Sequence, residues 1–128
     1  MKSFATLTSV IIVGSVGAAI AVSLILIGTD AYRTTASVEE FYKAKALTDT
    51  CAEQALDSIR LDINYQGNET VELGGGTCTI RPVVGARSET PTVQVEGNFN
   101  SAVRKAQITL THVTPQITIG NWQEVADF

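Results

Sequence analysis

The sequence predicts an α+β fold in which one long N-terminal helix packs on a small antiparallel β-sheet. Three observations carry this prediction. The chain opens with an apolar segment, it contains neither glycine nor proline from Thr29 to Gln66, and after Asn68 its hydrophobic residues alternate with a period of two. The length of 128 residues allows one domain and leaves little room for two packed ones.

Hydrophobic and charged residues are unevenly distributed along the chain. Of the first 29 residues 18 are hydrophobic, against 39 of the following 99, and no charged residue lies between Ser3 and Thr29. The remainder carries 13 acidic and 8 basic residues. An acidic body without a lysine or arginine cluster gains little from counterion release, so we expect no direct nucleic-acid binding.

Residues 1–29 are predicted to form a hydrophobic membrane-spanning or filament-core helix. A helix of about 26 residues extends roughly 39 Å, more than the roughly 30 Å hydrocarbon core of a bilayer. The main alternative is a cleaved secretory signal, because Ala19-Ile20-Ala21 offers small residues at a suitable spacing. The apolar run continues past that site, which favours a retained helix. Lys2 on one side and Asp30 on the other indicate a cytoplasmic N-terminus and an exported body.

Small residues gather within this apolar helix. Each glycine in a water-exposed helix costs about 1 kcal/mol relative to alanine, so their presence calls for an interpretation. One interpretation is that lipid tolerates them. The other is that Gly14, Gly17, Ala18 and Ala21 form a face for close helix–helix packing, or a site where the helix loosens. The residues alone do not decide between the two.

Residues 30–128 are predicted to form an exported body whose first part, 30–65, continues the helix. Its apolar residues recur at steps of three and four, which is typical of an amphipathic helix. They are Phe41, Ala44, Leu47, Cys51, Ala55 and Ile59, while Glu39 and Glu40 are predicted to lie on the solvated face. Gly67 and Asn68 tolerate left-handed backbone angles and should end a continuous helix of about 55 to 60 residues.

Residues 69–122 are predicted to form an antiparallel sheet of four or five strands. Gly74-Gly75-Gly76 joins two alternating runs as a hairpin, two further runs follow at 93–95 and 105–111, and Pro115 precedes a last short strand. We expect the amphipathic half of the helix to cover the apolar face of this sheet. Trp122 is predicted to lie in the core, with a surface contact as the alternative. His112 is predicted to be a structural residue on the inner face rather than a catalytic base.

The two cysteines are predicted to form a disulfide. Cys51 lies on the apolar stripe of the helix, and Cys78 shares the inner face of a strand with Ile80, so the two should meet. In an exported protein such a pair favours a disulfide, which would add about 3.5 kcal/mol of stability. The alternative is that both residues are buried free thiols. The long spacing of the cysteines and the single histidine predict no metal and no cofactor. With no serine or cysteine beside a visible catalytic partner, we expect no enzyme.

These features resemble the type IV pilin and pseudopilin family. Phe4-Ala5-Thr6-Leu7-Thr8 looks like the first mature residues of such proteins. Four further segments look like small pilin-like proteins of candidate-phyla (Patescibacteria-type) bacteria. They are CAEQAL at 51–56, GGGTCTI at 74–80, VRKAQITL at 103–110 and PQITIGNWQEVADF at 115–128.

The resemblance implies a structural subunit of a type IV pilus-like filament that assembles through its hydrophobic helix. The alternative is a membrane-anchored pseudopilin, minor pilin or adhesin of a secretion or attachment machine. The implied partners are other copies of the chain, other pilins, the membrane before assembly, a prepilin peptidase and the pilus assembly machinery. The implied location is a single pass through the cytoplasmic membrane, followed by an extracellular pilus that could serve adhesion or motility.

The resemblance also implies processing between Ser3 and Phe4, with Phe4 as the methylated N-terminal residue. Two positions differ from the usual family pattern, because Ser3 stands where glycine is usual and Thr8 where glutamate is usual. Threonine cannot form the charge pair that this glutamate makes with a neighbouring amine. Its absence is a feature of some tip or initiating minor pilins, or of a branch whose main subunit does without it. Separately, Asn68-Glu69-Thr70 matches an N-glycosylation sequon.

Overall fold

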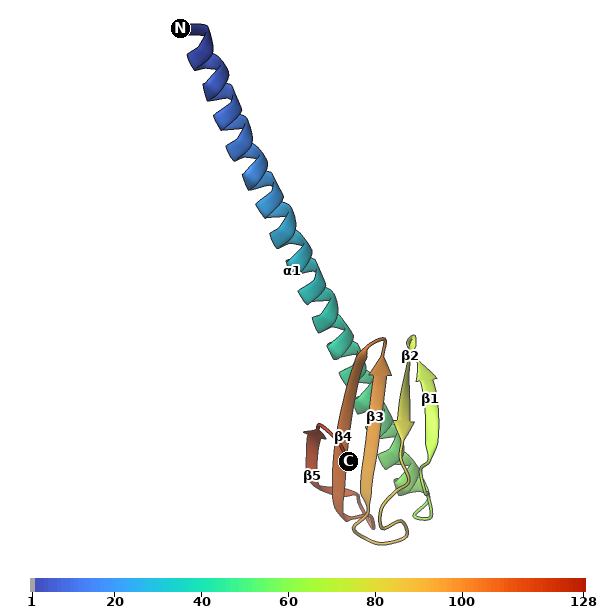
Figure 1. Ribbon diagram of the computed structural model, residues 1–128. Helices are drawn as coiled ribbons and strands as arrows, with labels where there is room; N and C mark the ends of the chain where they lie inside the picture. Colours follow the sequence, from blue (N-terminus) through green and yellow to red (C-terminus); the bar gives the residue numbers. More distant parts are fainter. Residues whose placement is uncertain (1) are drawn as a thin grey trace. The chain divides into compact units, whose positions relative to one another are not determined.

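The computed structural model describes residues 2–128, in which one helix is followed by five strands (Figure 1). Helix α1 spans Lys2–Leu61, and the strands are β1 (Glu69–Leu73), β2 (Gly76–Ile80), β3 (Thr92–Phe99), β4 (Ala102–His112) and β5 (Thr118–Val125). All pairings are antiparallel, in the order β1-β2-β3-β4-β5, so each strand pairs with its neighbours in sequence. The predicted α+β fold, a long N-terminal helix with a five-stranded antiparallel sheet, is confirmed.

The chain forms two compact units that share helix α1. The first ends at Ala36 and the second comprises Ser37–Phe128. The predicted boundary between residues 29 and 30 marks the change of composition, whereas the second compact unit starts seven residues later. Only this unit contains the sheet.

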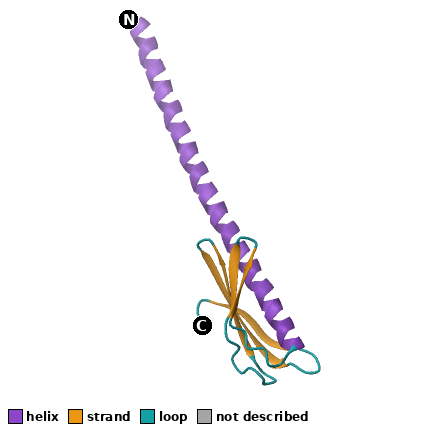
Figure 2. Cartoon of the chain, turned by 90° about the vertical axis from the view of Figure 1, so that its right-hand side faces the viewer, coloured by secondary structure: helices purple, strands orange, loops and turns teal. Residues whose placement is uncertain are grey.

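In the second unit, α1 lies against one face of the sheet and the opposite face is left without a helix (Figure 2). The helix residues that are buried follow the three- and four-residue spacing predicted from the sequence. They are Ala44, Leu47, Thr48, Cys51, Ala52, Ala55, Leu56 and Ile59. Phe41 was predicted to belong to this stripe, but 45% of its surface is exposed and the Arg104 guanidinium lies 5.5 Å from its ring centroid. The core therefore begins one turn later, at Ala44.

Gly97 on β3 lets the helix backbone approach the sheet closely. A Cβ atom at this position would lie 2.5 Å from the Ala44 carbonyl oxygen and 2.7 Å from the Thr48 backbone nitrogen, both too close for any side chain. The buried Thr48 hydroxyl uses this proximity, because it donates to the carbonyl of Ala44 at 2.9 Å and is also 3.1 Å from that of Arg104 on β4. Glycine in the middle of a strand thus serves the packing of the helix.

A disulfide joins the helix and the sheet beside this contact. Cys51 on α1 is bonded to Cys78 on β2, with 6.2 Å between their Cα atoms, as predicted. Cys78 is the register partner of Gly97, so the covalent link and the close approach are neighbours on the same face. Both cysteines are 1% exposed, and the bond therefore lies within the hydrophobic core.

The helix ends four residues earlier than predicted. It stops at Leu61, not at 65, because the Asp62 carboxylate accepts hydrogen bonds from both the backbone and the side-chain nitrogen of Asn64 and so stabilises a turn. Gly67 and Asn68 do adopt the left-handed conformation expected of them, with φ of 68° and 60°, but they lead the chain into β1.

Three predictions about the last strands were wrong. The sheet continues to Val125 rather than 122, and Trp122 lies within β5 with 39% of its surface exposed rather than in the core. Its register partner on β4, Ile108, is fully buried, so cover by α1 stops at β4. His112, predicted on the inner face, is exposed at the end of β4, where the pairing with β5 becomes irregular.

We expect Gly97→Ala to lower the free energy of unfolding by about 1–3 kcal/mol, because the added methyl group forces the helix away from the sheet. Thermal denaturation of the detergent-solubilised chain checks this. Gly28→Ala is the matched control, since a Cβ there meets no atom within 4 Å. Equal melting temperatures for the two variants would contradict the close-contact role of Gly97.

Candidate assembly surface

In the first unit, α1 is an isolated apolar helix. Its large hydrophobic side chains from Phe4 to Ile27 are each 54% to 72% exposed. By length and composition this is the one helix among the described residues that is able to cross a membrane, and a signal sequence has the same character. Apolar surface of this extent needs a partner, either lipid or protein.

The polar groups of this segment are satisfied within the helix itself. From Phe4 to Thr29, every hydroxyl donates to a backbone carbonyl three or four residues earlier, at distances of 2.9 to 3.3 Å. The residues are Thr6, Thr8, Ser9, Ser15, Ser23 and Thr29. Because a hydroxyl without a partner is costly in hydrocarbon, this pattern makes the segment compatible with a lipid or a dry protein environment.

The small residues singled out from the sequence lie on one side of this helix. At about 100° per residue, Gly14, Gly17, Ala18 and Ala21 fall within an arc of about 100°. A Cβ built on either glycine meets nothing within 4 Å, so the helix backbone is open to a partner along this face. The geometry fits close helix–helix packing, and the choice between that interpretation and simple tolerance by lipid stays a prediction.

The residues proposed for processing lie at the start of α1. Ser3 and Phe4 are both exposed helix residues. Thr8, at the position of the usual glutamate, donates to the carbonyls of Phe4 and Ala5 at 3.1 and 3.0 Å. Its hydroxyl is thereby used within its own helix. Cleavage and methylation at Phe4 stay predictions.

Helix α1 also holds the tip of the β3–β4 hairpin. The Glu40 carboxylate accepts hydrogen bonds from the Asn100 side-chain amide at 2.9 Å and from the Ser101 hydroxyl at 3.0 Å. Asn100 occupies the turn with φ of 51°. Glu39, by contrast, pairs with Lys43 on the exposed helix face at 2.7 Å, and this contact lowers the Glu39 pKa. The prediction of a purely solvated pair was therefore right for Glu39 and wrong for Glu40.

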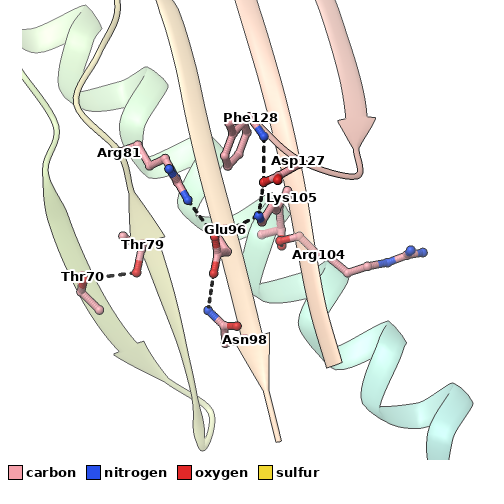
Figure 3. A network of polar contacts seen from close by, with 10 residues as sticks. Thr70, Thr79, Arg81, Glu96, Asn98, Arg104, Lys105, Asp127 and Phe128 are labelled. Carbon is pink, nitrogen blue, oxygen red and sulfur yellow. Dashed lines mark hydrogen bonds and ion pairs between the residues drawn. The ribbon is translucent and has the colours of Figure 1, made fainter. Parts of the chain in front are cut away.

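A polar network covers the sheet face opposite α1 (Figure 3). Glu96 on β3 accepts hydrogen bonds from Asn98 at 3.2 Å and Arg81 at 3.3 Å, and Lys105 on β4 pairs with Asp127 at 2.7 Å. Burial alone raises the Glu96 pKa, but the hydrogen bonds from Asn98 and Arg81 and the nearby positive charges outweigh it and lower the pKa overall. The Phe128 ring lies between two of these cations, with Arg81 at 4.7 Å. The network fixes the C-terminal residues against the sheet.

The predicted glycosylation site lies in an exposed turn. Asn68 is exposed, with φ of 60°, directly before β1, and Thr70 of the sequon lies within β1 with its hydroxyl 3.2 Å from that of Thr79. The sequon therefore stays a candidate site only, because such tripeptides also occur by chance.

Two further findings concern metal binding and similarity to known proteins. Across residues 2–128, no group of three or more histidine, cysteine, aspartate or glutamate side chains is arranged to hold a metal ion. Comparisons with models of known protein families, with curated proteins and with solved structures give no match for this chain.

Several structural residues were not identified from the sequence. A glycine inside an alternating strand is a signal for close backbone approach, and Gly97 could have been identified in this way. No sequence signal marks the contacts of Glu124 on β5. Its carboxylate lies 3.6 Å from the Lys45 ammonium on α1 and 3.1 Å from the Arg104 Nε. The contact with Arg104 Nε is an ion pair without hydrogen-bond geometry. These pairings depend on the tertiary fold.

We expect the double variant Cys51→Ala, Cys78→Ala to lose about 3.5 kcal/mol of unfolding free energy, because a crosslink over 27 residues restricts the unfolded chain. Denaturant titration of the variant against the oxidised wild type measures this difference. Wild-type protein treated with reductant is the control and should approach the stability of the variant. Free, alkylatable thiols in the untreated protein would contradict the disulfide.

We expect stability to decrease in acid partly through Glu89. Hydrogen bonds from the Thr114 hydroxyl at 2.7 Å and from the Val113 and Thr114 backbone N–H groups hold the pKa of Glu89 below its ordinary value of 4.5. A lowered folded-state pKa stabilises the fold above pH 4.5, and this contribution is lost as the pH falls through the lower value. Unfolding measured against pH should therefore show a shallower acid dependence for Glu89→Gln.

The matched control for this experiment is Glu53→Gln, since Glu53 is exposed and takes part in no ion pair among residues 2–128. Its acid dependence should equal that of the wild type. A wild-type slope for Glu89→Gln as well would show that the hydrogen bonds to Glu89 do not stabilise the fold.

Proposed function

We propose that this chain is a structural subunit of a type IV pilus-like extracellular filament. The observation that carries the proposal is the apolar, hydroxyl-satisfied helix from Phe4 to Thr29, which leads without a break into a disulfide-linked helix–sheet body. The resemblance of the opening residues and of the cysteine contexts to pilins supports the same function. We propose further that the helix spans the cytoplasmic membrane with its N-terminus inside before assembly.

Assembly in this proposal is a transfer of the helix from lipid to protein. Lipid tails are as apolar as the side chains that they contact, so hydrophobicity alone does not favour helix association. Van der Waals contact at small residues does, because backbones approach each other more closely there. The open face of Gly14, Gly17, Ala18 and Ala21 is the part of the helix suited to this contact.

A minor or initiating subunit is the second candidate, and Thr8 favours it. In the family the glutamate at this position pairs with the amine of a neighbouring subunit, and Thr8 brings no charge and bonds to its own helix. Such a subunit would sit at a filament end or in a secretion or attachment machine. N-terminal sequencing of the exported protein tests membership of the class, since a start at methylated Phe4 would establish processing by a prepilin peptidase.

We expect Gly14→Leu and Gly17→Leu each to reduce filament formation at least tenfold while leaving membrane insertion intact. Leucine is as compatible with lipid as glycine but prevents close approach of a second helix. Filaments are counted by electron microscopy and identified by peptide sequencing, and membrane fractionation measures insertion.

Ala19→Leu and Ser23→Leu are the matched controls, because at about 100° per residue they lie on the opposite side of the helix. They should form filaments at the wild-type level. Two observations together would refute the proposal. Filaments from wild-type cells would lack this chain, and cells from which the chain has been deleted would still form filaments. Normal filaments with leucine at both glycines would refute the role of the small face.

A further inference from the structure

An open hollow of about 550 Å³ lies at one end of the sheet, where two hairpins turn. Because consecutive strands pair antiparallel, the β1–β2 and β3–β4 turns fall at the same end (Figure 1). We call this feature the tip hollow. It is lined by Glu72, Leu73, Thr77, Asn98, Asn100 and the glycines at 74–76.

The side chains of the tip hollow offer hydrogen-bond acceptors. The Asn98 amide nitrogen donates to Glu96 at 3.2 Å (Figure 3). In the same way, the Asn100 amide nitrogen donates to Glu40 at 2.9 Å. A carboxylate only accepts hydrogen bonds, so these contacts fix the orientation of both amides and leave each side-chain carbonyl oxygen for another donor. Glu72 adds a carboxylate that takes part in no ion pair among residues 2–128.

The tip hollow is negatively charged, because Glu72 is the one charged residue in its lining. Lys43, whose ammonium lies 4.9 Å from the Phe99 ring centroid, is already paired with Glu39 at 2.7 Å. A negative, acceptor-rich hollow favours a ligand that brings hydrogen-bond donors and a positive charge, and it disfavours phosphates and acidic polymers. A calcium ion is also disfavoured, because it needs about six to eight oxygens around one point and the lining brings a single carboxylate.

The shape of the tip hollow fits a ring. Gly74 has a left-handed φ of 60°, and a Cβ there would meet nothing within 4 Å, so the backbone of the turn is open to a ligand. Leu73 beside it is 46% exposed. A sugar ring carries hydroxyl groups around its edge and C–H groups on its faces, so it can use both the acceptors and this apolar surface. The volume lies within the usual range for small-molecule sites and is wide for the slender side chain of a lysine.

We propose that the tip hollow binds a protonated amino sugar, such as a glucosamine unit of a cationic polysaccharide. The ammonium group of the sugar pairs with the Glu72 carboxylate, and ring hydroxyls donate to the side-chain oxygens of Asn98 and Asn100. This binding goes beyond the proposed function, because it belongs to the second unit alone and does not require assembly. In a filament, many copies of a weak site would act together on a surface that bears such sugars.

The test is calorimetric titration of the full chain, in detergent, EDTA and mildly acidic buffer, with the linear tetramer of glucosamine as the probe. We expect a dissociation constant of about 1 mM or below. Glu72→Lys should weaken binding at least tenfold, because it replaces attraction by repulsion. Glu53→Lys, the same charge change at an exposed position outside the tip hollow, should bind within about twofold of the wild type. A wild-type chain that does not bind the tetramer would overturn the proposal and leave the proposed function standing.

A second pair of variants separates a sugar site from general charge attraction. Asn98→Ala should weaken binding at least about threefold through the loss of an acceptor, whereas Asn121→Ala, at an exposed amide on β5 outside the tip hollow, should not. Unchanged melting temperatures verify that the variants fold. Tetralysine should bind at least tenfold more weakly than the sugar. Wild-type affinity in Asn98→Ala, or equal affinity for tetralysine, would overturn the proposal by showing a site for cations in general.

Discussion

The structure depends on how closely α1 approaches the sheet at Gly97. Without a side chain at this position, the backbones of helix and strand come near enough for the Thr48 hydroxyl to reach a carbonyl on β4 and for Cys51 to reach Cys78. Interiors pack at the density of organic crystals, so a small increase in this distance would be felt by every core residue on the helix face. The covalent and the non-covalent attachment of the helix share one location.

The main features of the fold could be predicted from the sequence because each rests on a strong local pattern. The apolar segment, the long interval without glycine or proline and the change to a period of two predict a helix followed by a sheet. The Cys51–Cys78 disulfide followed from the positions of both residues on inward faces. In such cases local propensity and tertiary packing favour the same structure.

The errors lie where tertiary geometry decides. The alternation of apolar and polar residues places Trp122 on the inward face of its strand. One helix is about 10 Å wide, however, and cannot cover five strands spaced about 4.8 Å apart. The inward face of β5 therefore remains exposed. The helix end at Leu61 depends on a turn made by Asp62, whose sequence signal is weaker than that of Gly67. Glu40 looked like an ordinary surface acid because its partners, Asn100 and Ser101, are 60 and 61 residues away.

The attachment of the sheet to the middle of a helix segment has a mechanical consequence. A force that pulls on the sheet reaches the backbone of α1 through the Cys51 sulfur and the core contacts between Ala44 and Ile59, several turns before the chain leaves the helix at Leu61. The connection between helix and β1 is thereby relieved of tension. The disulfide keeps the helix joined to the sheet at Cys51 even where the core contacts on either side of it open. In the filament that we propose, this attachment would let the helices carry load while the sheets remain folded.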